Sequence, residues 1–259
     1  MKRIAMLFLT ALFISGISVI SQEVTPGAVV GITSVVPATD EISNTQLETF
    51  YGKFLPVFMK EAPSIPFFLM KKIAGKRMGE YAEFYVFESL EARNEWFPEP
   101  GVTSDKAKQA LSNLDEYWNE YHKTVSSVDY TDYVVIPFKG ENIHLKPGNV
   151  VVIYECELAP EKGMTFEDLE KLYREEYGPA FTKSFQGVQF CVLKGERGER
   201  TGKYTELIVA KSMDEYKKWM TEDGASTEKA KQAYADMGEI QERMGKMYTY
   251  FRSNTYIVL

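Results

Sequence analysis

The sequence predicts an α+β fold in which one module of strands and helices occurs twice along the chain. A shift of 123 positions (179 minus 56) aligns residues 56–136 with residues 179–259 without a gap. More than a quarter of the aligned residues are identical, whereas ordinary residue usage would give about one in sixteen. In both halves, short β-branched apolar runs alternate with amphipathic segments, which is the pattern of mixed strands and helices.

The first half opens with an apolar, β-branched run at residues 29–36. A run of this length fits a strand and is too short for a helix to be preferred. A helix is expected next, because apolar residues keep to one helical face from Leu47 to Phe58. Ser43 and Gln46 precede this face with the spacing of an N-terminal capping box, which predicts where the helix begins.

The rest of the first half adds three strands and two helices. Residues 67–71 and 81–88 are expected to be strands, joined by a charged loop that contains glycine. A second helix is expected to begin at Ser89 and a third near Asp105, since serine and aspartate favour helix N-termini. A last strand is expected at residues 133–136.

The second half repeats this order. Its first helical face runs from Phe166 to Tyr177. Its later helices are expected to begin at Ser212, which has a capping-box partner in Glu215, and near Glu228. The expected strands of this half are residues 150–158, 188–194, 203–211 and 256–259.

Residues 1–21 have the pattern of a secretory signal. Lys2 and Arg3 precede an almost wholly apolar run, and Val19 and Ser21 fit the small-residue cleavage pattern. The alternative is a membrane anchor, since the run reaches the short end of a spanning length. We favour cleavage near Ser21, which predicts a periplasmic or secreted protein. The remaining chain divides into a first repeat at residues 22–136, a linker with two prolines and two glycines at 137–148, and a second repeat at 149–259.

The charge of the chain disfavours two classes of partner. Without Lys2 and Arg3 the chain has 28 basic and 37 acidic residues, so its net charge is 28 minus 37, or −9. Such a protein lacks the basic surface that nucleic-acid binding requires, and anionic lipid repels it. We therefore expect no nucleic-acid partner and no stable membrane association after signal cleavage. The sequence does not indicate an oligomeric state.

Two cysteines, Cys156 and Cys191, each lie in an expected strand. An oxidising compartment would permit a disulfide, but a disulfide needs Cα atoms within about 7 Å of each other. We favour two buried, unpaired thiols that pack as small apolar side chains, with pairing as the alternative.

Each half has the element order β-α-β-β-α-α-β, which is the split βαβ, or ferredoxin-like, plan with one additional helix. In this plan the helices cover one face of the sheet and leave the other face bare. Stacking the bare faces of the two halves would bury both of them, which gives a physical reason for the repeat.

With these features the chain resembles the dimeric α/β-barrel superfamily, in which two ferredoxin-like units pack sheet to sheet around a central cavity. The tandem form is similar to NIPSNAP and antibiotic-biosynthesis-monooxygenase-like proteins. This resemblance covers nearly all of the chain after the signal and implies an intramolecular barrel. The superfamily holds cofactor-independent monooxygenases, lactone isomerases, haem enzymes and stress-induced proteins, so it leaves the function open.

The alternation of side chains along the expected strands identifies the candidate site residues. Along residues 81–86 one face is wholly apolar, and the other carries tyrosine and glutamate. The more apolar face is expected to meet the helices, so that the polar face lines the barrel cavity. A carboxylate beside phenols in such a cavity can act as a general base, or it can orient a polar ligand. The predicted catalytic residues are Glu83 and Glu206, and the predicted ligand-binding residues are Tyr81, Tyr85 and Tyr204.

Metal and cofactor sites find no support in the sequence. Its only histidines, His122 and His144, form no ligand-spaced pair, and neither lies in an expected strand. The haem-binding branch of the superfamily would call for a barrel histidine. We therefore expect no cofactor and no metal. The aromatic residues around Trp118 and Tyr121 are at helical spacing and are expected to be core, although the matching helix of the second half differs, so that one half could keep a site the other lost.

Three hypotheses about function remain. The first is a protein that binds a small, partly apolar molecule in the barrel cavity. The second is a cofactor-independent monooxygenase or isomerase in which Glu83 or Glu206 removes a proton and a tyrosine stabilises the resulting anion. The third is an interaction protein without a small-molecule site. A pocket of about 300 Å³ or more that opens to solvent would favour the first two.

Overall fold

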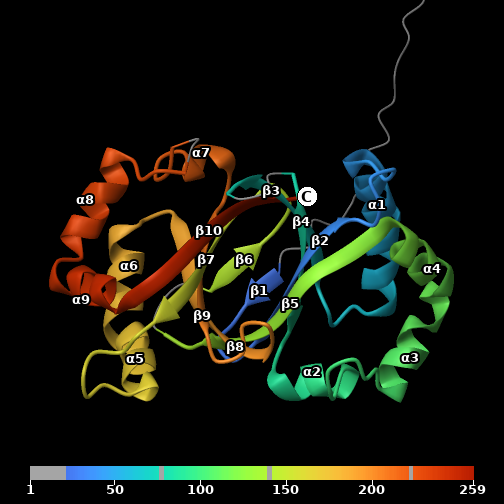
Figure 1. Cartoon of the computed structure of the whole chain (residues 1–259), viewed down its shortest axis with the longest axis horizontal. Coiled ribbons are helices and arrows are strands. Elements are labelled where there is room, and N and C mark those ends of the chain that lie inside the picture. Colours follow the sequence, from blue (N-terminus) through green and yellow to red (C-terminus); the bar gives the residue numbers. More distant parts are fainter. Residues whose placement is uncertain (1–21, 76–78, 139–141, 222–223) are drawn as a thin grey trace, which may run out of the picture.

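The computed structural model describes residues 22–75, 79–138, 142–221 and 224–259. Eight antiparallel strands close into one barrel (Figure 1), in the order β10-β3-β4-β2-β5-β8-β9-β7. Closure pairs every strand on both sides, so that the barrel has no open edge. The strands are β2 (Val29–Pro37), β3 (Phe67–Ala74), β4 (Tyr81–Phe87), β5 (Val125–Ile136), β7 (Val150–Leu158), β8 (Val188–Gly198), β9 (Tyr204–Ala210) and β10 (Tyr248–Val258).

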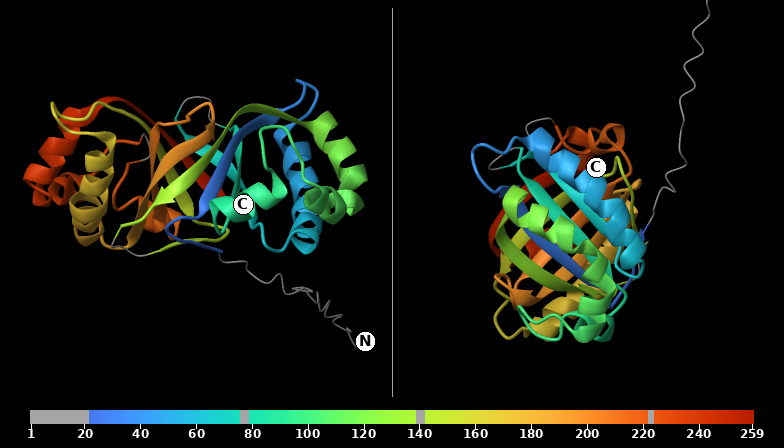
Figure 2. Two further views of the ribbon diagram at one scale, coloured as in Figure 1. Left: turned by 90° about the horizontal axis from the view of Figure 1, so that it is seen from below. Right: turned by 90° about the vertical axis from the view of Figure 1, so that its right-hand side faces the viewer.

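The helices form two layers at opposite ends of the molecule (Figures 1 and 2), each against the outer face of four neighbouring strands. The first layer covers β3, β4, β2 and β5, and consists of α1 (Asn44–Glu61), α2 (Leu90–Trp96), α3 (Asp105–Leu111), the 3₁₀ turn η1 (Ser112–Leu114) and α4 (Asp115–Thr124). The second layer covers β8, β9, β7 and β10, and consists of α5 (Phe166–Leu172), the π-helical turn η2 (Tyr173–Tyr177), α6 (Gly178–Ser184), α7 (Met213–Tyr216), α8 (Glu228–Asp236) and α9 (Glu239–Met247).

Local signals place the helix starts. Ser43 and Gln46 form the expected capping box at α1, and Ser89 caps α2. At α7 the Ser212 side chain accepts from the Glu215 backbone N–H, but the Glu215 carboxylate pairs with Lys218 instead of completing a box. Serine therefore predicts these helix starts more reliably than the full box does.

The barrel interior is packed largely with apolar side chains. Ala82, Phe84 and Val86 of β4 point into it, as do Leu207 and Val209 of β9. The expected orientation of the strand faces is therefore wrong, because the face with tyrosine and glutamate lies under the helices. An eight-stranded barrel has just enough interior for side chains, whereas under the helices Tyr51 and Tyr173 donate hydrogen bonds to the buried carboxylates of Glu83 and Glu206.

A two-stranded sheet packs on this interior core. It pairs β1 (Gln22–Val24) with β6 (Ile143–Leu145), and it adds Val24, Ile143 and Leu145 to the apolar cluster of the barrel. β6 lies within the segment predicted to be a linker, which is therefore partly structured.

Other differences from the prediction concern length. The last strand of each half, β5 or β10, is much longer than the four residues predicted, and the expected third helix is two helices in each half. Cys156 and Cys191 are buried free thiols. No helix in the described part of the chain is long and apolar enough to cross a membrane. The predicted signal at residues 1–21 lies outside the described residues.

Candidate functional site

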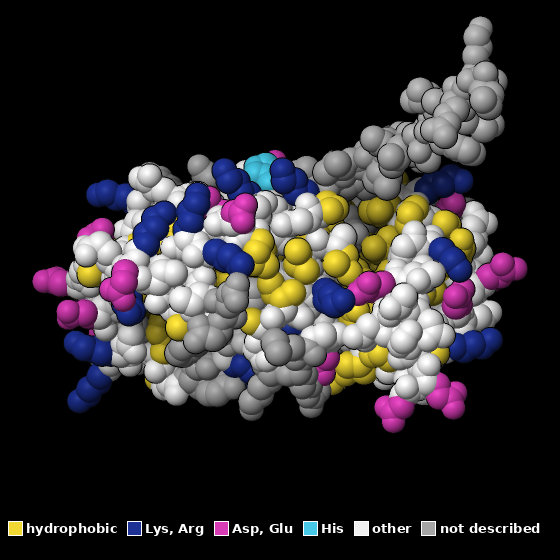
Figure 3. Space-filling view, turned by 90° about the horizontal axis from the view of Figure 1, so that it is seen from above, with side chains coloured by type: hydrophobic (Ala, Val, Ile, Leu, Met, Phe, Trp, Pro, Cys, Tyr) yellow, Lys and Arg dark blue, Asp and Glu magenta, His cyan; other side chains and the backbone are white. Residues whose placement is uncertain are grey.

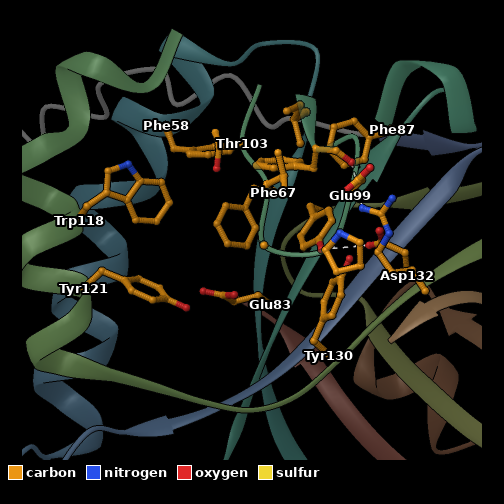
Figure 4. A pocket seen from close by; sticks show the side chains of 17 residues that line it. Phe58, Phe67, Glu83, Phe87, Glu99, Thr103, Trp118, Tyr121, Tyr130 and Asp132 are labelled. Carbon is orange, nitrogen blue, oxygen red and sulfur yellow. Dashed lines mark hydrogen bonds between the residues drawn. The ribbon is translucent and has the colours of Figure 1, made fainter. Parts of the chain in front are cut away.

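The first half holds a pocket of about 450 Å³ between its helices and the outer face of its sheet (Figure 4). Helices α1 and α4, strands β3, β4 and β5, and the loop between α2 and α3 form its walls. We call it the aromatic pocket, because its walls are mainly aromatic; they include Phe58, Phe67, Phe87, Phe97, Trp118 and Tyr121.

Glu83 of β4 is a buried carboxylate in the wall of this pocket. It is only 6% exposed, and the Tyr51 hydroxyl of α1 donates to it at 2.6 Å. Burial raises the pKa of Glu83 to about 7, although hydrogen bonds from Tyr51 and Tyr121 oppose the rise. Figure 4 shows the Tyr121 hydroxyl of α4 pointing toward Glu83. This carboxyl is therefore close to half-ionised at neutral pH, which suits proton transfer.

A second polar group lies further along the same sheet face. Register places Phe67, Tyr85, Gly31, Asp132 and Arg197 opposite one another in one row across five neighbouring strands. We call this the cross-strand row. Since side chains at opposed positions share a face, the row forms a continuous strip of the pocket floor.

Asp132 is the buried anion of the cross-strand row, with 1% of its surface exposed. It accepts from the Tyr85 hydroxyl at 3.1 Å and forms a short ion pair with Arg93 of α2. The Tyr85 ring lies over Gly31, where a Cβ atom would come within 2.0 Å of the ring. Glycine in this strand thus makes room for the tyrosine.

The second half has a pocket of its own, of about 720 Å³. Its carboxylate, Glu206 of β9, accepts from Tyr173 at 2.8 Å and from Tyr248 in a short hydrogen bond. Burial raises the pKa of Glu206. Cys156 also lines this pocket, and its pKa is raised by burial and by the nearby Glu206, so the thiol stays protonated.

A third, charged cavity of about 280 Å³ lies within the barrel, because Ile32, Tyr133, Ile153 and Tyr256 of the interior cluster line it. Its central groups are already paired: Arg252 donates to both carboxylate oxygens of Glu155 at 2.7 Å, and Arg200 lies 3.4 Å from the same carboxylate. These contacts tie strands together and favour a structural role.

The predicted site residues are distributed as follows. Glu83 and Tyr85 line the aromatic pocket, and Glu206 lines the pocket of the second half. The two glutamates thus lie in different pockets and do not share one cavity. Tyr81 and Tyr204 point to helix carboxylates instead, donating to Glu48 at 2.6 Å and Glu170 at 2.9 Å, and neither lines these two pockets.

Sequence reasoning missed several residues of the aromatic pocket. The helical spacing of Trp118 and Tyr121 predicts core residues, yet both line it. No sequence pattern described above points to Asp132 or Arg197, which line it as well. A signal for Asp132 was present, because Gly31 interrupts a β-branched strand and an isolated strand glycine marks a close approach.

No protein-family model matches the sequence, and no curated protein matches it. Solved structures do match its fold. One is a candidate monooxygenase from Fusobacterium nucleatum, with a TM-score of 0.51 and 12% identity over 91% of this chain and 94% of that one. Another is a mutant chlorite dismutase from Candidatus Nitrospira defluvii, with a TM-score of 0.53 and 7% identity over 90% and 92%. A haem-binding protein from Thermus thermophilus has a TM-score of 0.51 and 10% identity over 93% of both chains.

At these identities the similarity establishes the fold alone. The chain has the α+β architecture of the dimeric α/β-barrel, ferredoxin-like proteins, as the resemblance in the sequence implied. The particular similarity to NIPSNAP proteins stays a prediction.

The haem-binding neighbour raises the question whether this chain could ligate haem. His122 on α4 and His144 in β6 are both exposed, and neither lines the aromatic pocket or the pocket of the second half. Within the described residues, no group of three or more His, Cys, Asp or Glu side chains could hold a metal ion. The Cys156 thiol at the wall of the second pocket is held protonated. Neither pocket therefore offers a histidine or a thiolate as an axial haem ligand.

Proposed function

We propose that the protein binds a small, flat, mainly apolar molecule in the aromatic pocket and that Glu83 removes a proton from it. One observation carries this proposal: a buried carboxyl with a pKa of about 7 forms part of a wall that is otherwise mainly aromatic. Aromatic walls select a flat apolar skeleton, and a base with a pKa near the working pH suits proton transfer.

The proton would come from an acidic C–H or O–H bond of the bound molecule. Its electron pair stays on the molecule as an enolate or phenolate, and the hydroxyl of Tyr121, which faces Glu83, is placed to stabilise that anion. Return of the proton to another carbon gives an isomerase. With dioxygen as co-substrate, the carbanion carbon forms a bond to oxygen, which gives a monooxygenase whose second oxygen atom leaves as water.

The pocket volume favours these two functions over an interaction protein without a small-molecule site. At about 450 Å³ it lies within the range of small-molecule sites. The cavity inside the barrel, the expected location, is lined by charged groups that already pair with one another, so the helix-covered sheet face offers the better site. Similarity in fold to a candidate monooxygenase is compatible with the oxygenase alternative.

We further propose that the chain is a tandem of two ferredoxin-like repeats, exported to the periplasm or beyond after removal of residues 1–21. The support for the tandem is the repeated sequence and the grouping of four strands from each half in the barrel order. The support for export is the basic start and apolar run of residues 1–21. Figure 3 shows acidic and basic side chains interspersed over one face, which supports the absence of a nucleic-acid partner.

The test uses 2-tetralone, a flat ketone with an acidic benzylic C–H bond, in deuterium oxide. Deuterium incorporation is followed by NMR, and oxygen uptake is followed in parallel with an electrode. We expect the wild type to catalyse exchange and Glu83→Gln to slow it by about 100-fold or more. Glu206→Gln is the matched control and should retain more than half of the rate. Binding of 2-tetralone without deuterium exchange would show that the protein binds the molecule but does not catalyse proton transfer. Absence of both binding and exchange would refute the proposal.

A further inference from the structure

Arg197 is a residue of the second half that lines the pocket of the first half. It lies on β8, and it donates to the backbone carbonyls of Phe97 at 2.9 Å and Pro98 at 3.0 Å. These two bonds use two of the five N–H groups of a guanidinium. No described carboxylate lies within 4.0 Å of its side chain, so the charge has no partner there.

The nearest candidate for a partner is already engaged. Asp132 sits directly opposite Arg197 in the cross-strand row, but its carboxylate is taken by Arg93 and by the Tyr85 hydroxyl. The one buried carboxylate at this end of the pocket therefore pairs with Arg93 and leaves the Arg197 guanidinium without a carboxylate partner. Glu99, also in the lining, is exposed and forms no ion pair with Arg197.

The positive charge of Arg197 lies some distance from Glu83, the proposed base. Glu83 is on β4 and Arg197 is on β8, and strands β2 and β5 lie between them. Three strand spacings correspond to about 14 Å between the backbones of β4 and β8. The length of the arginine side chain makes the distance from the guanidinium to Glu83 shorter than this. Figure 4 shows Glu83 between Tyr121 on one side and Asp132 on the other. The interval suits a skeleton of two fused rings.

We propose that Arg197 is the anion-binding residue of the aromatic pocket, so that the molecule held against Glu83 carries a carboxylate at its opposite end. This inference rests on the proposed function and specifies its substrate class as a flat aromatic acid. A carboxylate is the group that a guanidinium with unused N–H donors recognises best, because it accepts two parallel hydrogen bonds. Binding would give the Arg197 guanidinium a carboxylate partner at the far end of the cross-strand row.

The pocket of the second half lacks this feature. The residue 123 positions before Arg197 is Ala74, which occupies the corresponding place in the register, opposite Thr255 of β10. The preference for acids should therefore belong to the aromatic pocket alone.

The experiment compares 2-naphthol with 6-hydroxy-2-naphthoate by isothermal titration calorimetry at pH 7. The two probes share a ring system and differ in the carboxylate. We expect the wild type to bind the naphthoate about tenfold more tightly than the naphthol, the strength of one charge-assisted hydrogen bond. Arg197→Gln should remove this advantage and change naphthol affinity less than twofold, Arg197→Lys should restore part of it, and the exposed Arg174→Gln should change nothing.

Each outcome bears on a definite claim. Because Arg197 also holds the loop at Phe97 and Pro98, equal weakening of both probes in Arg197→Gln would assign it to loop positioning and overturn the inference. If the wild type binds 2-naphthol as tightly as 6-hydroxy-2-naphthoate, the inference is overturned and the proposed function stays intact. If neither probe binds and 2-tetralone exchange is also absent, the proposed function fails and the inference fails with it.

Discussion

The two halves of the molecule place the same carboxylate at the same point of the sheet. Glu83 and Glu206 are 123 positions apart, each is 6% exposed, and burial raises the pKa of both. Each also accepts from a tyrosine of the first helical segment, Tyr51 or Tyr173. A buried glutamate with a phenol donor is thus common to both halves.

The second phenol beside each glutamate comes from a different element. In the first half it is Tyr121 of α4, and the residue 123 positions later is Met244. In the second half it is Tyr248, the first residue of β10, and the residue 123 positions earlier is Val125. The second tyrosine beside the glutamate therefore comes from a helix in the first half and from a strand in the second half.

The floors of the two pockets differ more. The cross-strand row of the first half holds a tyrosine, a glycine and two charged residues. The corresponding row of the second half has no charge; register makes it Phe190, Ile208, Val152, Thr255 and Ala74. A shared carboxylate with unlike surroundings indicates that the halves differ in which ligand they admit, and the following experiments address that difference.

Loss of the buried ion pair should have the largest effect. Arg93→Met leaves the Asp132 carboxylate, which is 1% exposed, without its cation. We expect the free energy of unfolding to fall by about 3–5 kcal/mol, as for other buried pairs that lose one partner, measured by urea unfolding at pH 7.

The second half supplies the control for this pair. Arg93→Tyr combined with Asp132→Thr installs the residues that the second half has at these places, Tyr216 and Thr255. Since no buried charge is then unpaired, the double variant should lose less stability than Arg93→Met. A double variant that is equally unstable would show that the two floors are not interchangeable.

The pH dependence of stability should show the raised pKa of Glu83. The unfolded chain releases this proton near 4.5 and the folded chain only at about 7, so the folded state binds more protons between these values. Stability contributed by the neutral carboxyl is present below pH 4.5 and is lost as the pH rises to 7. The loss is at most about 3 kcal/mol.

Paired variants separate the two glutamates. Urea unfolding at pH 4.5, 5.5 and 7 should show a smaller decline for Glu83→Gln than for the wild type, because glutamine has no proton to release. Glu206→Gln should remove a separate part of the decline, since the pKa of Glu206 is also raised. Equal declines in the wild type and Glu83→Gln would mean that Glu83 is ionised in the folded protein at all three pH values.

The fold was largely readable from the sequence because similar local signals occur in both halves of the chain. Strand positions followed from β-branched runs, and Ser43 and Ser89 marked helix starts. The full lengths of β5 and β10 were not readable, since polar residues such as Asp129 and Arg252 occupy them. Those residues are in strands because of their neighbours in the barrel rather than their own propensity.

The site was readable only in part. Alternation correctly grouped Glu83 with Tyr85 on one face, but it could not show which face meets the helices. That choice depends on where hydrogen-bond donors are available, and the donor Tyr51 is 32 residues away in sequence. Arg197 could not be assigned at all, because it reaches the pocket only through the pairing of β5 with β8.

The smallest effect concerns the aromatic wall of the first pocket. Trp118 lines that pocket, and Gln241 lines the pocket of the second half at the position 123 residues later. Trp118→Gln removes an indole face and should weaken 2-naphthol binding by about three- to tenfold in calorimetry, the range of one aromatic contact. Gln241→Trp is the reciprocal change and should leave naphthol binding to the first pocket unaltered. If Trp118→Gln had no effect and Gln241→Trp changed naphthol affinity instead, the flat ligand would belong to the second half, and the assignment of the aromatic pocket as its site would be reversed.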